Sequence, residues 1–129
     1  AFTGANSIAA AGSRTAPGAV VAGNLLASEA VLDACLGAFV AATGTMDTRL
    51  MAALVAAAQA GGDSRGLLSA AMLVVAADRP PLSLRVDHSD KPLEALADLH
   101  QRATSGDYAA WAQHVPTRND PHRAIPFPS

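Results

Sequence analysis

Apolar residues recur at helical spacing in three stretches of the chain, which predicts three amphipathic helices. Ser28 is a suitable N-cap for the first, with Glu29 in its first turn, and Gly44 ends it. The second begins near Asp47 and runs to residue 60, and the third covers residues 92–104. The apolar positions are Val31, Leu32, Cys35, Leu36, Phe39 and Val40 in the first, Leu50, Met51, Leu54, Val55 and Ala58 in the second, and Leu93, Leu96 and Leu99 or His100 in the third.

The segments between these helices carry strand patterns. Residues 19–26 predict a strand, and the continuous apolar run in residues 69–77 predicts a strand that is buried on both faces. Residues 82–87 alternate apolar and polar, as a half-buried strand does, and Pro80 lies in the turn before them, so these two strands are predicted to form a hairpin. Residues 1–4 resemble the end of a strand, and residues 5–18 a loop.

The C-terminal part carries little regular pattern. Residues 107–111 predict one more short turn of helix. From residue 113 onward the prolines at positions 116, 121, 126 and 128 exclude a regular element, and this tail is expected to lie over the surface or over a neighbouring subunit. We therefore divide the chain into a folded part, residues 1–105, and an irregular tail, residues 106–129.

Composition narrows the classes of function. Half of the 129 residues are apolar, mostly alanine, and the net charge is −2 without a basic cluster, which argues against a nucleic-acid partner. No apolar run is long enough for a membrane span, and no signal-peptide pattern is present. The single cysteine, Cys35, excludes an internal disulfide and favours a reducing compartment, hence a cytoplasmic location. No dinucleotide or phosphate-binding loop is present, so no cofactor is expected.

Residues 61–71 contain the densest polar chemistry, and they allow two interpretations. Gly61 and Gly62 end a helix in the commonest way, with Asp63 and Arg65 as a charged turn. Alternatively, the loop places Asp63, Arg65 and Ser69 at a functional site. Asn24, which follows a glycine in the predicted strand, is either a bulge residue or a site amide.

Other combinations of residues are weaker candidates for a catalytic or metal site. Ser69, His88 and Asp63 supply the residue types of a hydrolase triad, but triads are recognised by geometry. His88 lies between Asp87 and Asp90, which is a weak basis for a metal site, so no metal is predicted. Cys35 lies on an apolar helix face and is interpreted as a core residue.

The chain begins without an initiator methionine, and its first residues predict that it starts inside a strand; such a strand leaves backbone groups that need a partner segment. We expect it to be one part of a larger polypeptide; removal of a tag or leader is the alternative.

Four segments together resemble a family of mostly uncharacterised bacterial proteins that is itself similar to N-terminal nucleophile (Ntn) hydrolases. They are residues 1–4 (AFTG), 23–26 (GNLL), 61–71 (GGDSRGLLSAA) and 84–87 (LRVD), within a resemblance that covers about residues 1–105. The resemblance implies an α+β fold that is part of an αββα four-layer sandwich. It also implies that an N-terminal segment of the fold, as a separate chain or a removed part, completes the domain.

The resemblance further implies hydrolysis of an amide bond by an N-terminal Thr, Ser or Cys nucleophile. Ala1 has no nucleophilic side chain, so the nucleophile is expected on the missing segment; Thr3 qualifies only if two more residues are removed. The chain departs from the family pattern at Ala22, where glutamine is usual, and in residues 9–13, where an aromatic residue and a histidine are common. These losses put a shared substrate in doubt.

The leading hypothesis is an Ntn-type amidohydrolase or peptidase acting on a small amide substrate within a homo- or hetero-oligomer. Asn24, Asp63 and Arg65 are the candidate catalytic residues: Asn24 as a donor to an oxyanion or substrate, Asp63 and Arg65 to orient the nucleophile's amine or bind a polar substrate group. Thr3 and Ser69 are candidate substrate contacts. The alternatives are a non-catalytic structural or assembly subunit and a small-ligand binding module.

Overall fold

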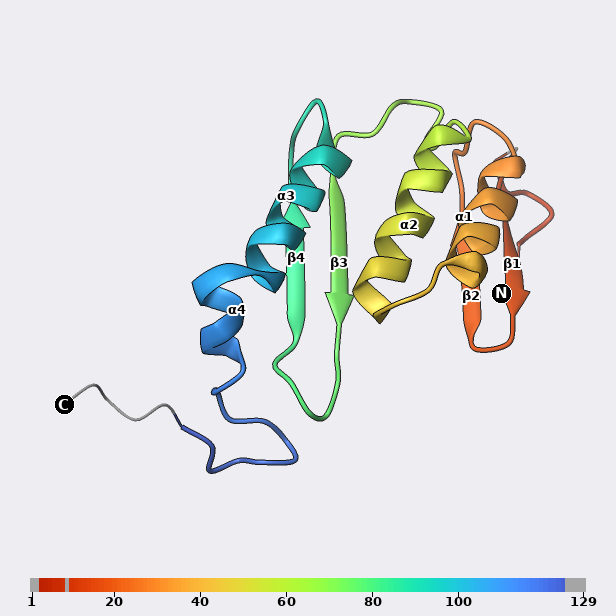
Figure 1. Ribbon diagram of the computed structural model, residues 1–129. Helices are drawn as coiled ribbons and strands as arrows, with labels where there is room; N and C mark the ends of the chain where they lie inside the picture. The colour runs from red at the N-terminus through yellow and green to blue at the C-terminus, as the bar shows by residue number, and fades with distance from the viewer. Residues whose placement is uncertain (1–2, 9, 125–129) are drawn as a thin grey trace. The chain divides into compact units, whose positions relative to one another are not determined.

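Two compact units, residues 1–68 and residues 69–129, each combine one β-hairpin with two helices (Figure 1). The structure, a computed structural model, describes residues 3–8 and 10–124. The first unit contains β1 (Gly12–Ala16), β2 (Ala19–Gly23), α1 (Ala30–Ala41) and α2 (Met46–Gln59). The second contains β3 (Ala70–Val74), β4 (Leu82–Val86), α3 (Pro92–Thr104) and α4 (Gly106–Ala112). The fold is therefore α+β, and each unit is considered separately below.

In the first unit, β1 and β2 pair antiparallel in a regular register, from Gly12 opposite Gly23 to Ala16 opposite Ala19. Helix α1 packs on the face that carries Gly12: a Cβ atom at that position would lie 3.3 Å from the Leu32 side chain. Glycine there lets the helix approach the strand closely. Val20, on the opposite face, is 64% exposed, so only one face of this hairpin is covered within the unit.

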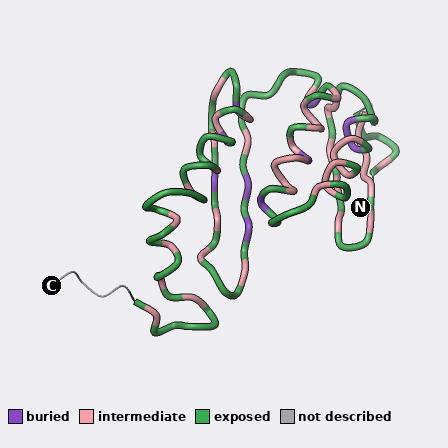
Figure 2. The backbone as a smooth tube through the Cα atoms, viewed as in Figure 1, coloured by how far each residue is buried: buried purple, intermediate pink, exposed green. Residues whose placement is uncertain are grey.

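Helices α1 and α2 are joined by a short connection and pack on each other, burying Val31, Leu32 and Ala53 (Figure 2). Arg49 of α2 fastens the C-terminal end of α1. Its Nε and Nη2 atoms donate to the Phe39 carbonyl at 3.2 and 3.0 Å, and its guanidinium lies 4.2 Å from the centre of the Phe39 ring. A cation at this end satisfies one of the carbonyls that a helix leaves unpaired.

Helix α2 ends in a Schellman motif formed by Gly61 and Gly62. The Gly62 N–H donates to the Ala57 carbonyl and the Gly61 N–H to the Ala58 carbonyl, both at 3.0 Å. Gly61 has φ +116° and Gly62 φ +55°, angles that residues with a Cβ atom rarely adopt. The prediction that this glycine pair ends the helix is confirmed.

In the second unit, β3 and β4 form an antiparallel hairpin with α3 packed on one face. Met72, Val74 and Leu84 point to that face and are buried, as is Leu96 of α3, which is 0% exposed. The buried positions alternate along β3 (Figure 2). Leu73 and Val75, on the other side, are 62% and 69% exposed. The prediction that this strand is buried on both faces is therefore wrong for the chain as described, because the helix of this unit covers only one face.

The loop predicted for residues 5–18 is also wrong, because it contains β1. The sequence of β1, GSRTA, lacks the apolar alternation that marks strands, and its pairing with β2 is what makes it extended. The strand predicted for residues 19–26 ends earlier, at Gly23, without a bulge in its pairing with β1. Of the strand end predicted for residues 1–4, residues 1 and 2 lie outside the described residues, and Thr3 and Gly4 are not in a strand.

The three predicted helices and the β3–β4 hairpin are confirmed, with small shifts at their ends. The third helix has the predicted bounds, with Pro92 in its first turn. The first starts later than predicted, at Ala30, and its N-cap residue is Glu29 in place of Ser28, without a side-chain capping bond. The short helix predicted for residues 107–111 is α4, and residues 113–124 contain no helix or strand.

Leu96 is the side chain on which the second unit most depends, because it is fully buried between α3 and the hairpin. We expect Leu96→Ala to lower the free energy of unfolding by about 2–5 kcal/mol, from lost burial and the cavity left behind. The matched control is Leu99→Ala on the same helix, where the side chain is 36% exposed and the loss should be clearly smaller. Urea unfolding followed by circular dichroism measures both; equal losses would contradict this packing.

Gly61 is constrained both by its backbone angle and by its neighbour, because a Cβ atom there would lie 2.7 Å from the Ala27 Cβ atom. Gly66 has a similar angle, φ +94°, but open space around it. Gly66→Ala should therefore cost only the backbone strain, about 1–3 kcal/mol. Gly61→Ala should cost that strain plus the steric clash. Thermal unfolding of the two variants compares them, and a Gly66→Ala variant that is less stable than Gly61→Ala would refute the assignment.

Candidate functional site

The loop that follows α2 is fastened to residues 25–27 by a short strand-like pairing. The Ala27 N–H donates to the Gly62 carbonyl at 2.9 Å, and the Ser64 N–H donates to the Leu25 carbonyl at 2.8 Å. The Ser64 hydroxyl donates to the same carbonyl at 2.8 Å. Between these bonds, Leu26 and Asp63 form an isolated antiparallel bridge. The backbone of the polar loop is therefore held by bonds on both sides of Asp63.

Asp63 and Arg65 form a two-pronged ion pair within this loop. The Nε atom of Arg65 lies 3.0 Å from Oδ1 of Asp63, and its Nη2 atom lies 2.7 Å from Oδ2. The backbone N–H of Arg65 also donates to Oδ1, at 2.8 Å. The carboxylate is less accessible than its partner: the Asp63 side chain is 22% exposed and the Arg65 side chain 68%. The pair is bidentate, with two nitrogens on two oxygens, and is therefore more specific in geometry than a single contact of opposite charges.

The hydrogen bonds from the Arg65 side chain, and then from its backbone N–H, lower the pKa of Asp63 from 3.8 to about 2. Asp63 in turn raises the pKa of Arg65. Both groups are therefore charged throughout the physiological range. Neither can exchange a proton near neutrality, so the pair cannot act as a general acid or base. What it can do is orient polar groups, since Arg65 still has its third nitrogen, Nη1, outside the ion pair.

The structure brings together part of the predicted site. Asn24 is exposed in the bend after β2, next to Leu25, whose carbonyl binds Ser64. It therefore lies in the chain segment that pairs with the loop of Asp63 and Arg65. The alternative that Asn24 is a bulge residue is excluded, because it falls after the end of the strand.

The two predicted substrate contacts, Thr3 and Ser69, are both exposed. Thr3 is exposed ahead of a turn in which the Ser7 N–H donates to the Gly4 carbonyl. Ser69 is exposed just before β3 and belongs to the other unit. The same division separates Asp63 from Ser69 and His88, the other members of the triad that the residue types allow.

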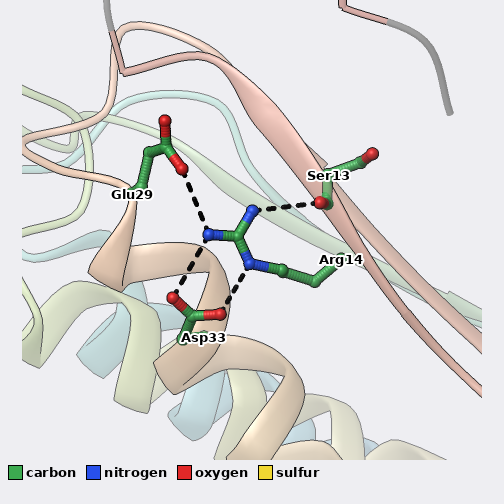
Figure 3. Close-up of polar contacts among 4 residues, drawn as sticks. All are labelled: Ser13, Arg14, Glu29 and Asp33. Carbon is green, nitrogen blue, oxygen red and sulfur yellow. Dashed lines mark hydrogen bonds and ion pairs between the residues drawn. The ribbon is translucent and has the colours of Figure 1, made fainter.

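A second charged cluster, on the first hairpin, was not predicted from the sequence (Figure 3). Arg14 of β1 reaches α1, where its Nε atom lies 2.6 Å from Asp33 Oδ1 and its Nη2 atom 3.1 Å from Glu29 Oε2. Its Nη1 atom donates to the Ser13 carbonyl at 3.1 Å. Glu29 and Asp33 are four residues apart on one helix face, a spacing that could have suggested a shared cation, but nothing local pointed to Arg14.

The ion pairs of Arg14 with Glu29 and Asp33 are best explained as a structural contact that holds β1 against α1. The hydrogen bond to Asp33, and then the one to Glu29, raise the pKa of Arg14. All of its nitrogens are occupied by groups of this unit, and both carboxylates are 62% exposed. Such exposed pairs contribute little stability individually, and their value is in fixing the geometry of β1 on α1.

Metal and thiol chemistry find no support in the part of the chain that is described. Residues 3–8 and 10–124 contain no group of three or more His, Cys, Asp or Glu side chains that could hold a metal ion. Asp87, next to His88, instead binds Arg85 through its Oδ1 atom. Cys35 is half-buried, and this burial raises the pKa of its thiol, which keeps the thiol protonated. Among the same residues, no helix is both long and apolar enough to cross a membrane.

Comparisons with known proteins place the chain in a family. A family model described as "Family of unknown function (DUF1028)" matches residues 1–96. No curated protein matches the chain. The crystal structure of protein SPO2555 from Silicibacter pomeroyi, described with the same family model, is 46% identical in sequence and superimposes with a TM-score of 0.90.

That match covers 99% of this chain but 55% of the solved protein, so the chain spans about half the length of its relative. The predicted resemblance to an uncharacterised bacterial family is supported to this extent, and the four helices and two hairpins correspond to part of a larger structure. Family model, sequence identity and structure agree, and the chain belongs to the DUF1028 family.

Proposed function

We propose that the chain is part of an amide-hydrolysing enzyme of Ntn type, whose nucleophile belongs to a part of the protein outside these residues. The observation that carries the proposal is the loop of Asp63 and Arg65. Backbone hydrogen bonds hold this loop to residues 25–27, and the two side chains form a bidentate ion pair within it. A preorganised donor whose charge does not depend on pH is what an acyl-transfer site needs near developing negative charge.

The exposure of the pair assigns its two members different roles. Asp63 is the more covered residue and holds the guanidinium in one orientation through two oxygens. Arg65 is the more exposed residue and presents Nη1 to a polar group of a substrate, or to the main chain that carries the nucleophile. Asp63 is therefore a positioning residue, and Arg65 is the residue that contacts the substrate or the main chain of the nucleophile.

In the proposed reaction the nucleophile attacks the amide carbonyl, and the negative charge that develops on the oxygen is stabilised by donors. Asn24 is the candidate donor of this chain, because its amide is exposed beside the fixed loop and carries two N–H groups. The α-amino group of the N-terminal nucleophile takes the hydroxyl or thiol proton during attack and gives it to the leaving amine, and water then hydrolyses the acyl-enzyme. Thr3 and Ser69, both exposed, stay as proposed substrate contacts.

The arrangement of the hairpins supports the αββα sandwich that such an enzyme requires. Each hairpin is packed by helices on one face and has an exposed opposite face, as half of one sheet layer would. Two-stranded hairpins are marginal on their own, and a solved relative of nearly twice the length has room for further strands. We therefore propose that the remaining part of the protein completes both sheets.

The second candidate is a non-catalytic assembly subunit, and one observation favours it. The bare face of β3 carries Leu73, which is 62% exposed, and Val75 directly after the strand is 69% exposed, whereas β4 carries Ser83 and Arg85 on its exposed positions. An apolar stripe of this kind suits a permanent protein interface. Both candidate functions require further strands that complete the two sheets. Only a chemical reaction at the loop of Asp63 and Arg65 would therefore distinguish the enzyme from the assembly subunit.

The pKa of Asp63 tests the geometry of the site directly. In the native protein the carboxyl should titrate at about 2, and in Arg65→Ala its pKa should rise toward 3.8 but stay below it, because the backbone N–H bond persists. Since the folded pKa is lowered, the pair stabilises the fold above the unfolded pKa and this contribution is lost as the pH falls through 2. NMR of the carboxyl carbon measures both values; titration of the native Asp63 near 3.8 would refute the pair.

Activity tests the function. The complete protein, expressed from its whole gene, is incubated with a panel of amide substrates and electrophilic acylating probes, and its intact mass reports any acyl-enzyme. We expect acylation to slow by roughly 100-fold in Arg65→Ala, because a preorganised donor is lost. Arg85→Ala is the matched control, since it also removes an exposed arginine paired with an aspartate two residues away, in the other unit.

Equal losses in Arg65→Ala and Arg85→Ala would reject the role given to the loop. An intact mass unchanged by every probe, with native circular dichroism, would reject the enzyme and leave the assembly subunit as the explanation.

A further inference from the structure

A cleft lies within the second unit, between the turn of its hairpin and the C-terminal tail. Its volume is about 470 Å³, within the range of small-molecule sites. One wall comes from the residues after β3 and the turn before β4, among them Val75 and Arg79. The other wall comes from residues 116–121, among them Arg118. The tail residues lie beyond the part of the chain that the family model matches.

The tail forms this wall because hydrogen bonds fix it to the hairpin. The Asn119 N–H donates to the Ala77 carbonyl at 3.2 Å, and Ala77 lines the cleft. The tail also closes on itself: the Thr117 N–H donates to the Asp120 carbonyl at 3.0 Å, and the Asp120 N–H to the Thr117 hydroxyl at 3.1 Å. Arg123 adds a bond to the Val115 carbonyl at 3.0 Å. The cleft is therefore preformed by a bonded turn.

The lining combines an apolar surface with two positive charges. Four prolines, at positions 80, 81, 116 and 121, contribute rings without backbone N–H groups. Arg79 and Arg118 are the charged residues of the lining, one from each wall. Asp78 precedes Arg79 and Asp120 lies two residues after Arg118, but neither aspartate lines the cleft. The residues that line the cleft are thus prolines, small apolar residues, one threonine and two arginines.

We propose that this cleft binds a small organic carboxylate. Its apolar part lies against the proline rings, and its carboxylate is bound by Arg79 and Arg118. Guanidinium groups match the planar, two-oxygen geometry of a carboxylate, and rigid walls reduce the entropy lost on binding. The site is separate from the loop of Asp63 and Arg65, since it is built wholly within the second unit, and the proposal does not depend on the hydrolase assignment.

Benzoate titration of the intact protein, followed by ¹H–¹⁵N NMR, tests the proposal, with benzamide as a neutral molecule of the same shape. We expect saturable shifts at Ala76 and Thr117 with benzoate, little shift with benzamide, and weaker benzoate binding at higher salt, because the interaction is ionic. Absence of saturable binding, or equal binding of the two probes, would overturn the site.

Variants identify the binding groups. Arg79→Gln and Arg118→Gln should each weaken benzoate binding at least about tenfold, the usual consequence of losing a charged hydrogen bond. Arg102→Gln is the matched control, because Arg102 is ion-paired with Asp98 on α3 of the same unit and does not line the cleft. If all three variants bind benzoate like the native protein, or if Arg102→Gln loses as much affinity as the others, the two cleft arginines do not bind the ligand.

Discussion

The reversal of the chain at Gly61 and Gly62 is the constraint on which the candidate site depends. Helix α2 can return its chain to residues 25–27 because both glycines adopt positive φ angles that pair the last N–H groups with the carbonyls of Ala57 and Ala58. The next two residues, Asp63 and Ser64, then lie where they can pair with the segment after β2. The helix end and the polar loop are thus parts of one turn, and the two interpretations of this stretch are compatible.

The same turn explains why Asp63 and Arg65 have a specific arrangement. Asp63 is held as a bridge residue, and its carboxylate accepts both the backbone and the side chain of Arg65 two positions on. This bidentate ion pair keeps the Asp63 carboxylate and the Arg65 guanidinium charged near neutral pH. The consequence for mechanism is restrictive: within a hydrolase such a pair positions and recognises, while the proton transfers must involve other groups.

Helices and the second hairpin were predictable from the sequence because their signals are local. The stripe around Leu96 has helical spacing and Pro92 marks its start, so neighbouring residues suffice. The strand β1 was not predictable, because Ser13 and Thr15 carry no apolar pattern and their conformation depends on β2. The exposed face of β3 was not predicted for a related reason. An apolar run indicates that burying the strand is favourable, but it does not indicate which segment of the protein covers each face.

For the candidate site, the sequence predicted Asp63 and Arg65 together because they lie two residues apart, but it did not predict the Arg14 cluster that joins β1 to α1. The partners of Arg14 lie 15 and 19 residues away, on an element whose distance from β1 only the folded chain defines. Asn24 was proposed as a site residue because it follows Gly23, and a glycine within a strand can mark a bulge. The strand ends at Gly23, so no bulge is present there. Ser69 was grouped with the loop by sequence proximity, whereas the chain changes unit between residues 68 and 69.

The pairing of residues 25–27 with the polar loop also has a consequence for the order of folding. The bond from the Ser64 hydroxyl to the Leu25 carbonyl spans 39 residues, whereas the hairpin and the helix pair of this unit form between segments that are close in sequence. Closing a longer loop costs more chain entropy, so local contacts form first. We therefore expect the polar loop to reach its final position only after α1 and α2 have associated, which would make the candidate site one of the last parts of the unit to be assembled.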